Sequence, residues 1–120
     1  MDDLSLLRHV VYETAGRYHL AHGEFFTSLV KASNLDVIKA AIKARKAGAL
    51  YNVALQKLIS YLIVSGLAIS HKDEILRAKQ TIESVEREKT ALTAYQREEA
   101  SSQTDKANQA QPSAVQRALA

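Results

Sequence analysis

The chain of 120 residues is long enough for one domain, and its 47% hydrophobic content with a single Pro and four Gly argues against an all-β fold. It has no Cys, which excludes a disulfide scaffold, a thiolate metal site and a cysteine nucleophile. Sixteen Lys and Arg against thirteen Asp and Glu give a net charge of +3, which is too small a bias to indicate nucleic-acid binding by itself.

The first predicted helix runs from Leu4 to about Lys31. Asp2 or Asp3 can cap it, because a short acceptor side chain satisfies backbone N–H groups that the first turn leaves without a partner. Apolar side chains then recur at spacings of mostly three and four, which places them on one face of the helix. These positions are Leu4, Leu7, Val11, Ala15, Tyr18, His22, Phe25, Phe26 and Leu29.

A second helix is predicted to begin at the sequence of residues 33–36, which has the spacing of a capping box. Its inward-facing phase shifts at Gly48, and because Gly commonly terminates helices, we expect this helix to be broken near that residue. The stretch from Ala49 to Ser70 is apolar on nearly all sides, so protein or lipid must cover most of it. We therefore expect it in the middle of the fold, with the first and last helices against it.

The third predicted helix begins near Ser70 and carries the seven-residue repeat of a coiled-coil seam. The repeat weakens at Lys89 and has ended by Gln96. From Ala100 the composition turns to Ser, Gln, Thr, Asn and Asp, which cannot bury enough apolar surface to offset the entropy of ordering. The predicted organisation is a helical domain over residues 1–99 and a disordered polar tail over residues 100–120.

These elements predict an all-α fold: an antiparallel bundle or an extended hairpin of three long helices, the second broken near Gly48, with a disordered C-terminal tail. Each flanking helix offers one apolar stripe, and two stripes do not readily cover an apolar rod. Either the short basic helix before Gly48 folds back as a fourth wall, or a second chain supplies the cover. We therefore expect self-association or a protein partner.

The sequence predicts no catalytic, cofactor-binding or metal-binding residues. His19 and His22 have the spacing of two ligands on one metal, but no third ligand converges on them. His22 lies on the apolar stripe and is expected to be a hydrogen-bonded core residue. There is no Gly-rich phosphate loop and no ordered nucleophile with its base. We expect neither an enzyme nor a small-molecule substrate.

The expected function is that of a non-enzymatic helical interaction protein that acts by helix–helix association: an assembly factor, a secretion-type chaperone or a small subunit of a larger complex. We expect it in the cytoplasm, because the acidic start of the sequence lacks the cationic and apolar regions of a secretory signal. The polar tail would serve as a tether. The predicted partner or oligomer interface consists of Leu55, Leu58, Leu62, Ile75, Ile82, Val85 and Leu92.

The sequence leaves two alternatives open. Lys39, Lys43 and Lys46, with Arg45 at their border, form a basic ridge that could contact phosphates or an acidic partner, as in a helical nucleic-acid-binding accessory protein. The same ridge could equally be a solvated surface whose long stems cover apolar neighbours. The segment from Val53 to Ser70, with Lys57 as its only full charge, approaches the length of a membrane-spanning helix, although several polar residues dilute it.

Overall fold

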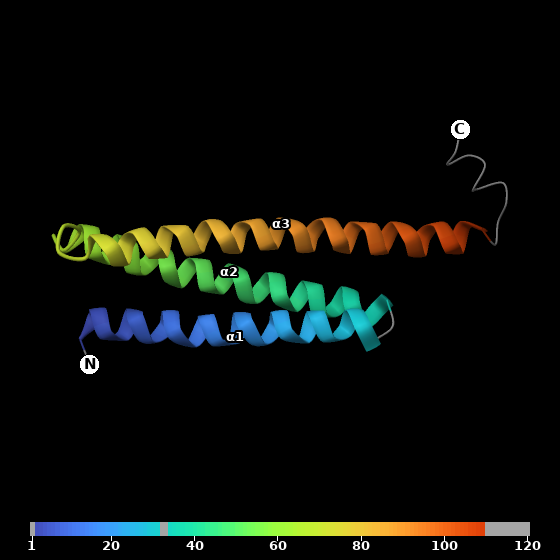
Figure 1. The fold of residues 1–120 in the computed structure, drawn as a ribbon, viewed down its shortest axis with the longest axis horizontal. Helices are drawn as coiled ribbons and strands as arrows, with labels where there is room; N and C mark the ends of the chain where they lie inside the picture. Colours follow the sequence, from blue (N-terminus) through green and yellow to red (C-terminus); the bar gives the residue numbers. More distant parts are fainter. Residues whose placement is uncertain (1, 32–33, 110–120) are drawn as a thin grey trace, which may run out of the picture.

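The computed structural model describes residues 2–31 and 34–109, which form three α-helices and no strand. These are α1 (Asp3–Lys31), α2 (Asn34–Val64) and α3 (Lys72–Gln109). Consecutive helices run antiparallel, in an elongated arrangement with α2 between α1 and α3 (Figure 1). The predicted all-α fold of three long helices is confirmed.

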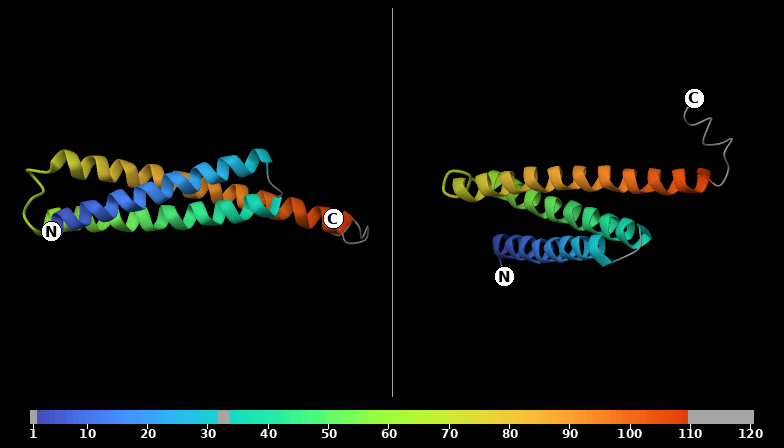
Figure 2. Two further views of the ribbon diagram at one scale, coloured as in Figure 1. Left: turned by 90° about the horizontal axis from the view of Figure 1, so that it is seen from below. Right: turned by 45° about the vertical axis from the view of Figure 1, so that its right-hand side comes forward.

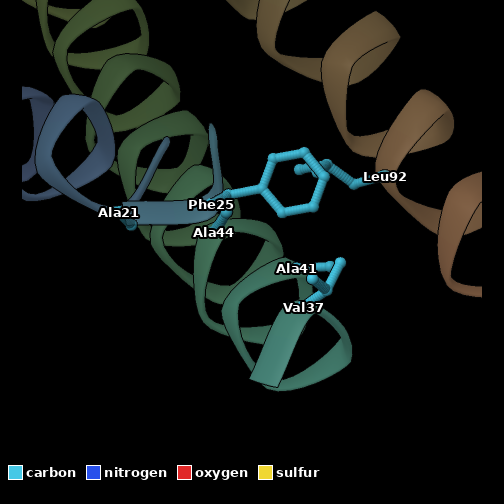
Figure 3. Close-up of a cluster of buried hydrophobic side chains, with 6 residues drawn as sticks. All are labelled: Ala21, Phe25, Val37, Ala41, Ala44 and Leu92. Atoms are coloured by element: carbon cyan, nitrogen blue, oxygen red, sulfur yellow. The ribbon is translucent and has the colours of Figure 1, made fainter. Parts of the chain in front are cut away.

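The central position predicted for the apolar segment is confirmed for its helical part, residues 49–64, whereas residues 65–70 form the turn after α2, where Ile69 is 93% exposed. α1 and α3 each pack along α2, whereas the backbones of α1 and α3 do not come close to one another. Near the turn from α1 to α2, the ring of Phe25 lies between Leu92 of α3 and the small residues Ala41 and Ala44 of α2 (Figure 3). Near the opposite end, Leu58 and Leu62 of α2 pack with Ile75 of α3. α2 therefore contributes residues to the hydrophobic core near both of its ends.

Gly48 lies inside α2, which is one continuous helix, so the predicted break is wrong. A Cβ atom at this position would lie 3.2 Å from Cγ1 of Val85 on α3 and 3.3 Å from the ring of Tyr18 on α1. Both distances are tighter than ordinary van der Waals contact. The glycine costs roughly 1 kcal/mol of helix propensity relative to Ala, and it lets both neighbouring helices approach α2 at one level.

α2 ends at Val64, so the predicted continuation of the helix to Ser70 is wrong. The cause is Gly66, which has a φ of +72°. Its backbone N–H donates to the carbonyl oxygen of Ile63 over 3.1 Å, and the N–H of Leu67 donates to that of Leu62 over 2.8 Å. These two bonds form a Schellman motif. Leu67 packs back on the cluster of Leu58, Leu62 and Ile75. The sequence therefore stays apolar after residue 64 although the helix has ended.

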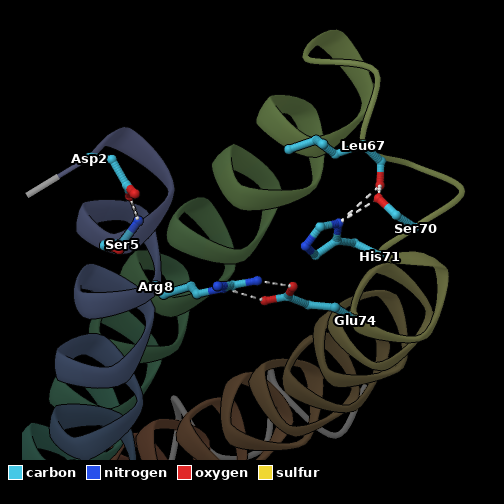
Figure 4. A network of polar contacts seen from close by, with 7 residues as sticks. All are labelled: Asp2, Ser5, Arg8, Leu67, Ser70, His71 and Glu74. Atoms are coloured by element: carbon cyan, nitrogen blue, oxygen red, sulfur yellow. Dashed lines mark hydrogen bonds and ion pairs between the residues drawn. The ribbon is translucent and has the colours of Figure 1, made fainter.

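The start of α1 agrees with the prediction, because the carboxylate of Asp2 accepts a hydrogen bond from the backbone N–H of Ser5 over 2.7 Å (Figure 4). This bond lowers the pKa of Asp2. At the start of α3, by contrast, the hydroxyl of Ser70 donates to the carbonyl oxygen of Leu67 over 3.2 Å. Ser70 therefore belongs to the turn, and the helix begins two residues later, at Lys72.

α3 continues as a helix to Gln109, past the boundary predicted at residue 100, and projects beyond the turn that joins α1 to α2 (Figure 2). Extending an existing helix adds a hydrogen bond for each residue fixed, so the polar sequence can follow the helix that precedes it. Residues 110–120 of the predicted tail lie outside the described residues, as does Ser33 of the predicted capping box. Disorder in the tail stays a prediction.

The role of Gly48 is tested by adding side chains at three helical glycines. We expect Gly48→Leu to lower the free energy of unfolding by about 2 kcal/mol or more, because the new atoms overpack a filled site. Gly16→Ala and Gly23→Ala are the matched controls, since nothing lies within 4 Å of a Cβ at either position. Each should raise the free energy of unfolding by about 0.5–1 kcal/mol. Urea denaturation measures all three, and an unchanged value for Gly48→Leu would contradict the close approach.

Candidate interaction surfaces

The residues predicted as a partner interface lie in the core of the single chain. Six of the seven are buried, Leu62 completely, and Ile82 is half-buried. They pack α2 against its two neighbours within the chain, and Leu92 also borders a hollow between α1 and α3. The periodicity correctly indicated that these side chains are covered, but it could not show that the same chain covers them. The six buried residues are Leu55, Leu58, Leu62, Ile75, Val85 and Leu92.

A first candidate surface lies between α1 and α3, whose backbones stay apart and so leave a hollow alongside α2. We call it the aromatic groove. It has a volume of about 300 Å³ and is mainly apolar, with His22 and Glu88 as its polar members. Phe26 and Leu29 at its edge are 61% and 41% exposed. The apolar lining consists of Phe25, Phe26 and Leu29 of α1 and of Ala91 and Leu92 of α3.

A second hollow, of about 470 Å³, shares Glu88 with the aromatic groove and lies next to it between the same two helices. Tyr18 and His19 of α1 and Tyr51 of α2 contribute to its lining. Beyond it, Arg8 of α1 and Glu74 of α3 form an ion pair with N–O distances of 2.7 and 3.0 Å (Figure 4). The hydrogen bonds from Arg8 lower the pKa of Glu74. This pair bridges α1 and α3 near the N-terminus of α1.

His22 is the histidine that lines the aromatic groove. Its ring packs edge-to-face on Tyr18, with centroids 4.4 Å apart. The predicted hydrogen bond is not present among the described residues, because Nε2 of His22 is buried without such a partner. Glu88 lies 3.5 Å from Nε2, but its side chain is 47% exposed, so solvent screens its charge. Burial, with a smaller contribution from the charge of His19, therefore lowers the pKa of His22.

Among the described residues, no group of three or more His, Asp and Glu side chains is arranged so that it could hold an ion. The ring of His19 lies 5.5 Å from that of Tyr18, centroid to centroid. His22 contacts Tyr18 and, at 6.3 Å between centroids, Phe26. An apolar and aromatic lining favours contact with apolar side chains of another molecule.

The lowered pKa of His22 predicts a pH dependence of stability. Near pH 6 the unfolded chain binds more protons at this residue than the folded chain, so stability falls as the pH drops below about 6.5. We expect His22→Gln to lose less stability than the wild type between pH 7.5 and 5.5. Urea denaturation at the two pH values measures the difference. Equal losses in the two proteins would show that His22 is not the group responsible.

The basic ridge lies on the outer side of α2. Lys39, Lys43 and Lys46 are exposed, and Arg45 is half-buried. Nζ of Lys43 forms an ion pair of 2.8 Å with the carboxylate of Glu24 on α1. The ridge is therefore accessible to solvent. A phosphate contact and a purely solvated surface would both require this, so the exposure fits either alternative.

α2 also meets the length and composition of a membrane span, over Leu35–Val64, and 33% of the apolar window in it is buried in the fold. Core helices of soluble proteins meet the same criteria. The span predicted at residues 53–70 is not a single helix, because Gly66 ends α2.

No protein-family model matches the chain, and neither a curated protein nor a solved structure matches it. Function is therefore inferred from the surfaces alone.

Proposed function

We propose that this chain is a non-enzymatic interaction protein that associates through the aromatic groove, and that the molecule seated there is a second copy of the chain. The observation that carries the proposal is the separation of α1 from α3, which leaves Phe26 and Leu29 exposed beside an apolar hollow. A fourth helix placed in this hollow would complete a four-helix arrangement.

The groove suits a second copy because its hollow and its protruding side chains lie on one patch. A two-fold axis brings the same patch of two molecules together, so each must supply both the knob and the hole. Here Phe26 of one copy can enter the hollow beside Phe26 of the other. The patch also avoids like-charge repulsion, since its two titratable residues are His22 and Glu88. Aromatic side chains in such a position commonly dominate the binding energy.

The proposal assigns no catalytic role to the groove. Its members other than His22 and Glu88 have hydrocarbon side chains, which neither transfer protons nor attack a substrate. Nε2 of His22 and Oε2 of Glu88 have the geometry of a weak contact, 3.5 Å apart. Apolar contact is the chemistry that this surface supports.

Self-association is tested by the mass of the protein in solution over a range of concentrations. We expect the wild type to form a dimer, and Phe26→Asp to weaken dimerisation by about tenfold or more, because a charge replaces a central apolar contact. Tyr12→Asp is the matched control: this aromatic residue of α1 is 79% exposed and does not line the groove. It should dimerise like the wild type. A wild type that stays monomeric at all concentrations would overturn the proposal.

A further inference from the structure

A second surface, on the outer side of α2, combines exposed cations with exposed apolar side chains at regular spacing. Lys46, Leu50, Val53 and Lys57 follow one another at intervals of four, three and four residues, and all are exposed. This spacing places them on one helical face, with the two lysines about 16 Å apart along the axis. We call these residues the basic–apolar strip. Leu50 and Val53 at its centre are 57% and 46% exposed.

The strip borders a groove between α1 and α2. This groove has a volume of about 260 Å³, and Leu20 of α1 and Ala47 and Leu50 of α2 give it an apolar lining. Arg17 and Lys43 also line it. This surface is concave and apolar and has cations around it. It therefore fits a partner with the convex ridge of a helix better than it fits a partner with a flat surface. Leu20, which faces this groove, is 64% exposed and so is accessible to a partner.

The charge of this face is of one sign. α2 contains a single acidic residue, Asp36, against five basic ones. Among the described residues, Lys39, Lys46 and Lys57 have no ion-pair partner, whereas Lys43 is paired with Glu24. A second copy docked here would bring lysines against lysines, which disfavours self-association at this surface. The carboxylates of α3 between residues 72 and 94 alternate with bases, so that helix also offers no acidic face to match it.

The geometry points to an acidic amphipathic helix of another protein as the partner of the basic–apolar strip. Its contact face would carry a carboxylate, two apolar residues and a second carboxylate at positions i, i+4, i+7 and i+11. This pattern is the same in both directions, so either orientation of the helix fits. Leu50 and Val53 would supply most of the binding energy, because exposed ion pairs contribute little. Lys46 and Lys57 would select the partner and accelerate its association.

Nucleic acid fits the strip less well. Phosphates would contact the lysines, but Leu50 and Val53 lie between Lys46 and Lys57 and offer nothing to a phosphate. No aromatic residue stands in the strip on which a base could stack. The apolar centre of the strip thus favours a protein helix.

The test is fluorescence anisotropy of the full-length protein with a labelled synthetic helical peptide that has Glu, Leu, Leu and Glu at positions i, i+4, i+7 and i+11. A peptide with Gln in place of both Glu residues is its control. We expect the acidic peptide to bind about three- to tenfold more tightly at low salt, the effect of two exposed ion pairs. The double variant Lys46→Glu/Lys57→Glu should bind it about tenfold or more weakly than the wild type does.

Three comparisons make the result specific. A peptide with Lys in place of both Glu residues should bind the Lys46→Glu/Lys57→Glu protein better than the wild type. The double variant Lys72→Glu/Lys79→Glu, which changes two exposed lysines of α3, should bind the acidic peptide like the wild type. Phe26→Asp should also leave this binding unchanged, so failure here and failure of the proposed self-association are distinguishable.

A duplex DNA of 20 base pairs and vesicles of phosphatidylglycerol are the competing probes. Equal binding of the acidic and the Gln peptides, or no binding of either, would overturn the inference. It would also be overturned if DNA or vesicles bound more tightly than the acidic peptide and lost this binding in Lys46→Glu/Lys57→Glu.

Discussion

The close approach of three helices at Gly48 is the constraint on which the rest of the fold depends. Tyr18 and Val85 reach α2 from opposite neighbours at the one position that has no side chain. Since α2 is apolar on most faces, it needs cover from two directions, and the glycine lets α1 and α3 provide it at the same level. At this level α1 and α3 bury area against α2, whereas most side chains at position 48 would hold the helices apart. A single chain can therefore shelter much of its apolar helix.

The same arrangement leaves two surfaces of different character on either side of α1. Because the backbones of α1 and α3 approach α2 and not each other, an aromatic hollow remains between them. On the other side of α1, the outer face of α2 combines Leu50 and Val53 with lysines. A surface with little net charge can pair with its own copy, whereas a surface of one charge sign favours a different partner. One small chain could in this way join a copy of itself to another protein.

The helices could be predicted from the sequence because their signals are local. The apolar spacing in α1 and the acceptor side chain of Asp2 act within a few residues. The helix and its cap are as predicted, but the predicted stripe is buried only in part, since Phe26 and Leu29 are exposed and Ala21, which was not in it, is buried. The two glycines of α2 and its turn show the limit of such reasoning. Gly48 permits close packing and Gly66 adopts a positive φ that ends the helix, but the residue type is the same. Only the neighbours in space distinguish the two roles.

The candidate surfaces were harder to predict for a related reason. Periodicity shows that Leu62 and Val85 are covered, and it does not show by which helix. The pairing of Arg8 with Glu74 joins residues far apart in the sequence, so no local pattern predicts it. The basic ridge was visible in the sequence because its lysines recur on one helical face. Leu50 and Val53 follow the basic ridge along α2. The sequence does not show that they lie at the surface, because this depends on the positions of α1 and α3.

Amide hydrogen exchange of the dilute protein, measured residue by residue, tests most directly whether the chain shelters its own central helix. We expect the slowest exchange in α2 from Ala41 to Leu62, around Gly48, at concentrations where the protein is monomeric, because helices covered on two sides open least often. Exchange in that segment as fast as at the helix ends, slowed only by adding a partner or lipid, would contradict this expectation.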